Sequence, residues 1–80
     1  MHAVHAIVSN VSQSHVPANI RAEVARAGKN QADIAELLGI TRQAVSQRML
    51  GRVDFRISEI TAIANYLGVP SSALIDGTAA

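Results

Sequence analysis

The sequence predicts an all-α fold, a compact domain of five short helices, from three observations. Hydrophobic residues make up 49% of the 80 positions, but only Phe55 and Tyr66 are aromatic and fourteen residues are Ala. Such small side chains favour closely packed helices over a deep enzyme cleft. Apolar residues also recur at spacings of three and four through most of residues 15–76. Finally, Gly or a capping residue stands where successive stretches of this pattern stop or start.

The two ends of the chain lie outside this pattern. Residues 1–14 show no sustained apolar period and include several Ser and Asn residues, so we expect an N-terminal arm that is flexible or a short strand. Residues 77–80 are expected to form a frayed tail. A single domain is therefore predicted over residues 15–76.

The first predicted helix begins at Ser14 or Val16, because Pro17 is tolerated in a first turn. Its apolar residues follow at spacings of four and three, and Gly28 ends it as a left-handed cap residue. The residues expected on its inward side are Ile20, Val24 and Ala27.

The second helix is predicted to begin after Asn30, which can cap it, with Asp33 placed to complete a capping box. Gly39 ends this helix after about two turns. Its inward stripe is Ile34, Ala35 and Leu38.

The third helix is predicted from Arg42 to Met49 or Leu50, after Ile40 buries in the turn and Thr41 caps the helix with its hydroxyl. At 100° per residue, Val45 and Met49 point inward. The residues on the opposite arc, about 140° wide, are Arg42, Gln43, Ser46 and Gln47. Arg48 lies nearer the buried side, so its stem is expected to pack on the core while its head reaches the edge.

Two further helices complete the prediction. Gly51 opens a loop, after which an apolar stripe indicates a fourth helix that ends at Gly68. That stripe is Ile57, Ile60, Ile63, Ala64 and Leu67. A last short helix from residues 70–72 is expected to bury Leu74, with Ile75 as a second candidate.

The charge is polarised although the net charge is only +1. Residues 41–56 contain four Arg and one Asp, a balance of +3, whereas the other residues contain two Arg and one Lys against five acidic residues, a balance of −2. A basic end on one short segment is what a phosphate-facing surface needs.

The two short helices between Gln31 and Leu50, with a tight turn at Gly39, have the geometry of a helix-turn-helix. This arrangement resembles the lambda repressor-like, Cro-type family of DNA-binding domains over about residues 16–76. The matching positions are Gln31, Ile34, Ala35, Leu38, Gly39, Ile40, Val45 and Met49. Many members of that family join the first helix to the end of the third by an ion pair. The matching positions here are Val24 and Met49, which predict an apolar contact instead. Members of that family also often begin the fourth helix with Ser or Thr. Arg56 occupies that position here, so the resemblance implies that Asp54 or Ser58 caps the helix.

The resemblance implies sequence-specific binding of double-stranded DNA by a repressor or regulator of phage or bacterial type, with residues 42–49 in the major groove. Arg, Gln and Ser side chains can pair with base edges, and the residues expected to read bases are Arg42, Gln43, Ser46 and Gln47. The residues expected to hold phosphates are Gln31, Thr41, Arg48, Arg52 and Arg56. Ordinary solvent-exposed side chains are the alternative for both sets.

A pair of subunits on a two-fold DNA site would supply further specificity, with the N-terminal segment or residues 70–80 as candidate contacts. A monomer is the alternative, and DNA wrapping is another role for the N-terminal segment. The absence of Cys removes thiol chemistry and Cys-based zinc sites. No acid pair, activated nucleophile or phosphate loop points to an enzyme, and no cofactor or small-molecule ligand is implied. His2, His5 and His15 have no carboxylate or Cys to complete a metal site, so none is expected.

The rival interpretation is a protein-interaction module that uses the helix-turn-helix as a scaffold. It is disfavoured because the outward arc of the third helix lacks large apolar anchors. Neither a signal sequence nor a run of about 20 apolar residues is present, which predicts a cytoplasmic protein without a membrane partner. The resemblance to DNA-binding domains implies that it is associated with the nucleoid.

Overall fold

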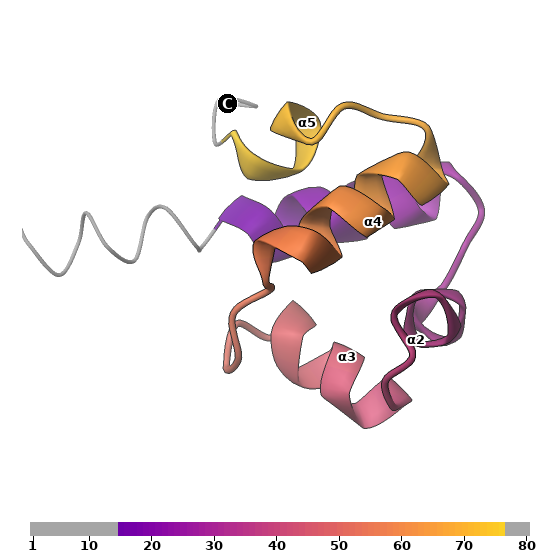
Figure 1. The fold of residues 1–80 in the computed structure, drawn as a ribbon, viewed down its shortest axis with the longest axis vertical. Coiled ribbons are helices and arrows are strands. Elements are labelled where there is room, and N and C mark those ends of the chain that lie inside the picture. Colours follow the sequence, from indigo (N-terminus) through magenta and orange to yellow (C-terminus); the bar gives the residue numbers. More distant parts are fainter. Residues whose placement is uncertain (1–14, 77–80) are drawn as a thin grey trace, which may run out of the picture.

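A computed structural model describes residues 15–76 and contains five helices and no strand within that range (Figure 1). The first helix covers residues 15–26. The others are α2 (Gln31–Leu38), α3 (Arg42–Met49), α4 (Ile57–Leu67) and α5 (Ser72–Ile75). The all-α prediction is confirmed. The arm predicted for residues 1–14 and the tail predicted for residues 77–80 lie outside the described residues.

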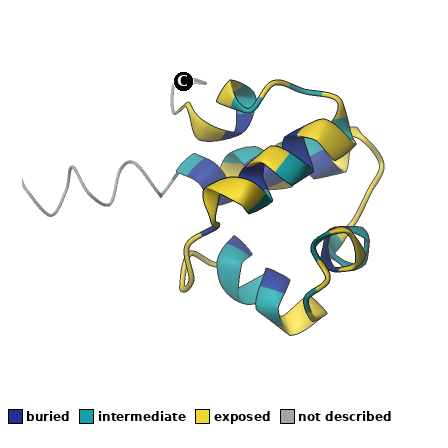
Figure 2. Ribbon diagram, in the orientation of Figure 1, coloured by how far each residue is buried: buried dark blue, intermediate teal, exposed yellow. Residues whose placement is uncertain are grey.

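One hydrophobic core joins all five helices (Figure 2). Each helix supplies a side chain with no exposed surface, and these are Ile20, Ile34, Val45, Ile63 and Leu74. In the described part of the chain, no polar or charged residue is buried in this core. Helix α4 contacts both α2 and α5 and so lies between the helix-turn-helix and the C-terminal helix. None of the described helices is long and apolar enough to cross a membrane.

Polar contacts fix the outer helices to this core. The Asn19 side-chain amide donates to the carbonyl oxygens of Leu74 and Asp76 at 3.1 and 2.8 Å, which ties the first helix to α5. Lys29 places its ammonium group 5.3 Å from the ring centroid of Tyr66, so the turn before α2 also contacts α4. These contacts hold the elements that flank the helix-turn-helix.

Three details of the predicted inward faces are wrong. Ala27 is exposed because the first helix ends at residue 26 and leaves it in the turn. Ile57 is 71% exposed, since it begins α4 at an end that no other described element covers. Ile75 is 40% exposed, and Leu74 alone anchors α5 in the core. Helical spacing gives the direction of a side chain, but it does not say whether another element covers it.

The predicted cap of α4 is also wrong. Neither Asp54 nor Ser58 caps this helix. Instead the Glu59 carboxylate reaches back and accepts a hydrogen bond from the Arg56 backbone amide at 2.9 Å. In a capping box, the side chain three residues into the helix accepts a hydrogen bond from the backbone amide of the N-cap residue. This bond uses only the backbone of the N-cap residue, so an arginine can occupy that position.

Candidate nucleic-acid interface

The turn between α2 and α3 has the left-handed backbone that the sequence predicts. Gly39 has φ 69°, and its amide hydrogen bonds to the last turn of α2. A Cβ here would meet no other atom within 4 Å, so the preference for glycine comes from the backbone conformation and not from crowding. Ile40 packs against the core directly after it. The two helices are thereby held at a fixed angle.

Both helices of the motif begin with side-chain caps, as predicted. Asn30 accepts a hydrogen bond from the Asp33 amide at 3.0 Å and the Asp33 carboxylate accepts from the Asn30 amide at 2.9 Å. Thr41 accepts from the Ala44 amide at 3.0 Å. Each cap binds only one amide of the first turn, and other amides of that turn have no partner within the helix. Together with the helix dipole, these free amides attract anions. Gln31, half-buried, is the first residue of α2.

Removing the α3 cap should cost stability without altering the core. The Thr41→Ala variant is expected to lose about 1 kcal/mol of unfolding free energy, which lowers the melting temperature by roughly 4–8 °C. Thr61→Ala is the matched control, because Thr61 is exposed within α4 and caps nothing. Thermal unfolding followed by circular dichroism checks this, and equal melting temperatures for the two variants would contradict the role of the cap.

Helix α3 has the buried side that the sequence predicts, but only half of its predicted outward arc is exposed. Val45 and Met49 are 0% and 4% exposed and anchor the helix in the core. Arg42 and Gln43 are exposed, whereas Ser46 and Gln47 are half-buried. Within the described residues, no side-chain hydrogen bond holds Arg42 or Gln43, so the most accessible pair of donors is at the N-terminal end of α3.

Arg48 lies between α3 and α4. Its Nε and Nη2 atoms donate to the two carboxylate oxygens of Glu59 at 3.0 and 3.2 Å, and Nη1 donates to the Ala44 carbonyl at 3.2 Å. The side chains of this ion pair are 13% and 12% exposed. Such a bidentate, shielded ion pair restricts the rotation of α3 about its own axis, which we call its roll, relative to α4. The sequence predicted that the head of Arg48 reaches the edge of the domain, whereas the structure holds it in a largely shielded ion pair with a carboxylate of the same chain.

Burial raises the pKa of Glu59, but its hydrogen bonds outweigh that effect. Hydrogen bonds from Arg48 and from the Arg56 amide, together with the charges of both guanidinium groups, favour the ionised carboxylate, so the pKa of Glu59 lies below its ordinary value. Glu59 therefore stays charged where it joins the start of α4 to α3. Glu59 stands three residues after Arg56, which is the spacing of a capping box. That spacing is the signal in the sequence from which the capping role of Glu59 could have been predicted.

Arg21 is a second positioning residue that the sequence analysis missed. Its Nη1 atom donates to the Met49 carbonyl oxygen at 2.9 Å and so satisfies one of the free carbonyls at the C-terminal end of α3. Val24 and Met49 both lie in the core. This agrees with the apolar contact predicted at the two positions where many family members have an ion pair. A polar link between the first helix and α3 exists as well, but it uses a backbone acceptor that no sequence pattern reveals.

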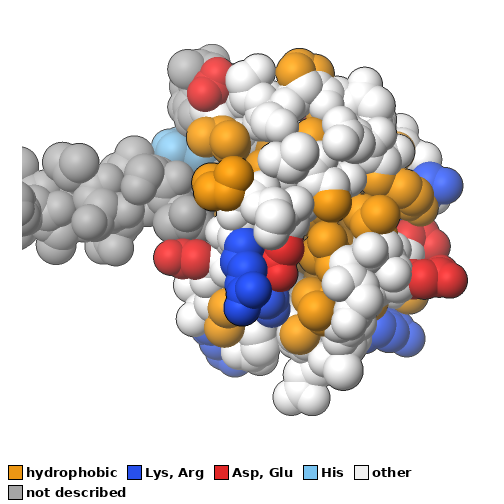
Figure 3. All heavy atoms as spheres, viewed as in Figure 1, with side chains coloured by type: hydrophobic (Ala, Val, Ile, Leu, Met, Phe, Trp, Pro, Cys, Tyr) orange, Lys and Arg blue, Asp and Glu red, His pale blue; other side chains and the backbone are white. Residues whose placement is uncertain are grey.

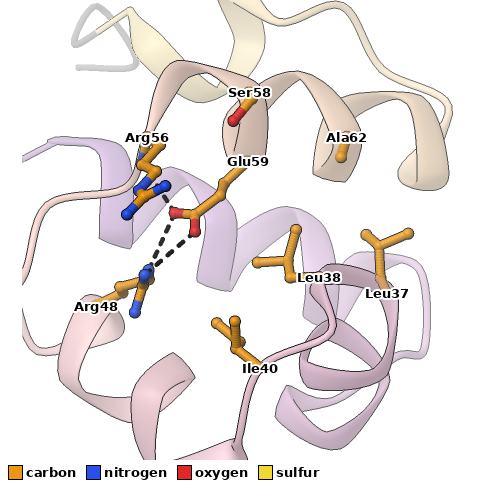
Figure 4. A pocket seen from close by; sticks show the side chains of 8 residues that line it. All are labelled: Leu37, Leu38, Ile40, Arg48, Arg56, Ser58, Glu59 and Ala62. Carbon is orange, nitrogen blue, oxygen red and sulfur yellow. Dashed lines mark hydrogen bonds and ion pairs between the residues drawn. The ribbon is translucent and has the colours of Figure 1, made fainter.

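The remaining predicted phosphate ligands are on the loop after α3 and at the start of α4. Arg52 and Arg56 are exposed. The Gln47 carbonyl accepts from the Arg52 amide at 2.9 Å and folds this loop back on the end of α3. Arg48 and Arg56 also border an open groove of about 430 Å³ between α2 and α4 (Figure 4). Its apolar lining includes Leu37, Leu38, Ile40 and Ala62.

Two short helices joined by a tight turn, the second with a buried apolar side and an exposed polar side, define a helix-turn-helix domain. Comparison with known proteins agrees, since the helix-turn-helix family pattern matches residues 20–74. The chain belongs to this family, the lambda repressor-like, Cro-type helix-turn-helix DNA-binding domains. The resemblance seen in the sequence is confirmed.

One relative is an uncharacterised helix-turn-helix-type transcriptional regulator, YonR, derived from the SPbeta prophage of Bacillus subtilis (strain 168). It is 36% identical over 51 residues, which cover 64% of this chain and 47% of the relative. The chain thus matches about half the length of that protein. No solved structure matches the chain.

Proposed function

We propose that the protein is a sequence-specific regulator of transcription, of the phage or bacterial repressor type, and that α3 enters the major groove of double-stranded DNA. The observation that carries this proposal is the N-terminal end of α3, where Arg42 and Gln43 are exposed and take part in no side-chain hydrogen bond or ion pair within the described residues. Arg can pair with guanine O6 and N7, and Gln with adenine N6 and N7. Ser46 and Gln47 extend the same face and complete the proposed reading set.

The proposed phosphate contacts surround this face. Gln31 and Thr41 stand at the N-terminal ends of α2 and α3, and Arg52 and Arg56 follow α3 along the chain. We assign Arg48 a different contribution, because three of its nitrogen atoms already donate to acceptors inside the chain. It supports binding by holding α3 in position. A regulator of this kind would act on the nucleoid in the cytoplasm.

Selection from a random pool of duplex DNA tests the proposal. The wild-type chain is expected to enrich one motif at near-physiological salt, and two-fold repetition of that motif would indicate a pair of subunits. Its affinity should fall as salt rises, with a log–log slope near −0.9 for each phosphate contact. A flat salt dependence without enrichment would favour the protein-interaction module instead.

The phosphate contacts should affect all sequences equally. Arg52→Ala is expected to weaken binding to every duplex by a similar factor and to make the salt slope shallower by about one unit. Arg26→Ala is the matched control, because Arg26 is an exposed arginine of the first helix that pairs with Glu23. A loss confined to particular base pairs would move Arg52 into the reading set.

A further inference from the structure

The groove between α2 and α4 combines an apolar part with a charged end (Figure 4). Its apolar part is lined by Leu37 and Leu38 of α2, Ile40 of the following turn and Ala62 of α4. Leu37 is 36% exposed although it lies in this groove, so part of the apolar lining is open to a partner. An exposed apolar groove rimmed by polar side chains is typical of an interaction site.

The charged end of the groove carries more positive than negative charge, and Figure 3 shows basic and acidic side chains beside a band of hydrophobic ones on this face. Arg48 donates to both carboxylate oxygens of Glu59 at 3.0 and 3.2 Å, so these two charges are paired. The Arg56 guanidinium is exposed and takes part in no ion pair or side-chain hydrogen bond within residues 15–76. The exposed Ser58 lines the same end. Arg56 and Ser58 are therefore available as donors to a carboxylate.

Such a groove fits a segment of another protein better than a small molecule or a nucleic acid. Small-molecule sites enclose most of the surface of their ligand, whereas this groove is open. A nucleic acid carries a phosphate at every step and would leave the apolar lining without a complementary partner. In helix-in-groove recognition, a protein segment lays its apolar side chains into an apolar groove. A segment with a carboxylate beside its aliphatic side chains therefore complements both parts of the groove.

We infer that this groove binds a segment of another protein in which an Asp or Glu side chain lies beside aliphatic side chains. The carboxylate of that segment contacts Arg56 and Ser58, and its aliphatic side chains pack on Leu37, Ile40 and Ala62. Arg56 is also a proposed phosphate ligand, so the bound segment and a DNA phosphate compete for one guanidinium group. The partner therefore inhibits DNA binding, a consequence that rests on the proposed function.

Selection from a library of random peptides of about 12 residues, roughly three helical turns, tests the inference without DNA. The wild-type protein is expected to enrich peptides in which Asp or Glu lies within about four residues of Leu, Ile or Val. Enrichment of no peptide, or of peptides without an acidic residue, would overturn the inference. A synthetic peptide of residues 1–14, which contain no acidic residue, is expected not to displace the enriched peptide. Displacement would assign the groove to this chain's own N-terminal segment and overturn the inference.

Two pairs of variants show whether the enriched peptide occupies the groove. Leu37→Asp and Arg56→Ala are each expected to weaken its binding about tenfold, because the first loses apolar packing and the second loses a charge-assisted hydrogen bond. The matched controls are Leu50→Asp and Arg26→Ala, since both residues are exposed and lie outside the groove lining. Circular dichroism verifies that each variant is folded. The same peptide affinity for groove and control variants would contradict binding in the groove.

Competition with DNA separates this inference from the proposed function. A peptide concentration that saturates the wild-type protein is expected to lower its affinity for the DNA motif about tenfold and to leave that of Leu37→Asp unchanged. Peptide binding without this competition would refute the shared use of Arg56. Enrichment of a DNA motif without peptide binding would refute the groove inference alone, whereas peptide binding without any DNA motif would refute the proposed function alone.

Discussion

Arg42→Ala and Gln43→Ala are each expected to remove the preference for particular base pairs while the domain stays folded. Each bidentate contact between such a side chain and a base contributes about 1–3 kcal/mol of discrimination, or roughly 5- to 150-fold in the ratio of affinities for right and wrong sequences. Both side chains are exposed and leave the buried anchors Val45 and Met49 untouched. The loss should therefore appear in specificity and not in stability.

Competition between the selected motif and single-base variants of it measures this effect. Arg26→Ala provides the control, because it removes the same kind of side chain from the first helix. Arg42→Ala should lose discrimination at guanine positions and Gln43→Ala at adenine positions, each at its own base pair. If both variants select the wild-type motif with unchanged discrimination, α3 does not read bases through these residues.

The half-burial of Ser46 and Gln47 was not predicted. The buried side of α3 and the exposure of Arg42 and Gln43 could be predicted, because they depend on one local property, the helical period. The same applies to the caps at Asn30 and Thr41, whose bonding partners lie three residues along the chain. Such contacts are fixed by spacing in the sequence, and the structure confirms them.

The position of Arg48 shows where local spacing stops being informative. Its partner Glu59 is eleven residues away on another helix, and the two meet only because the fold brings α3 and α4 within reach of these long side chains. Arg21 is similar, since it bonds to a backbone carbonyl 28 residues away. The exposure of Ile57 likewise depends on the absence of a covering element among the described residues. These features are set by tertiary packing, which the order of residues does not reveal without the fold.

Glu59→Gln is expected to destabilise the domain by about 2 kcal/mol, since it leaves the shielded Arg48 guanidinium without a charged partner. The amide that replaces the carboxylate can still accept one hydrogen bond, but it cannot balance the charge. For a domain of this size the melting temperature should fall by roughly 10 °C at neutral pH. Glu23→Gln is the matched control, because its pair with Arg26 is a surface contact between neighbouring turns, where Arg26 is 68% exposed.

The pH dependence of stability separates this ion pair from simple packing. Because the folded pKa of Glu59 is lowered, the folded wild-type protein binds this proton less readily than the unfolded chain does. The stabilisation is fully present above the unfolded pKa of about 4.3, and it is lost as the pH falls through the lower folded value. Urea unfolding should therefore show wild type and Glu59→Gln converging in stability as the pH falls below about 4.

A pH-independent difference between the two proteins would instead assign the effect to packing around residue 59. The same pair also links stability to DNA recognition, because Glu59 fixes Arg48 and Arg48 fixes the roll of α3. At temperatures where Glu59→Gln remains folded, it should therefore bind its motif more weakly than Glu23→Gln does. That loss should come with a weaker preference for the motif, since a rolled α3 misplaces Arg42 and Gln43 relative to the bases. Arg52→Ala, in contrast, is expected to reduce affinity without reducing preference.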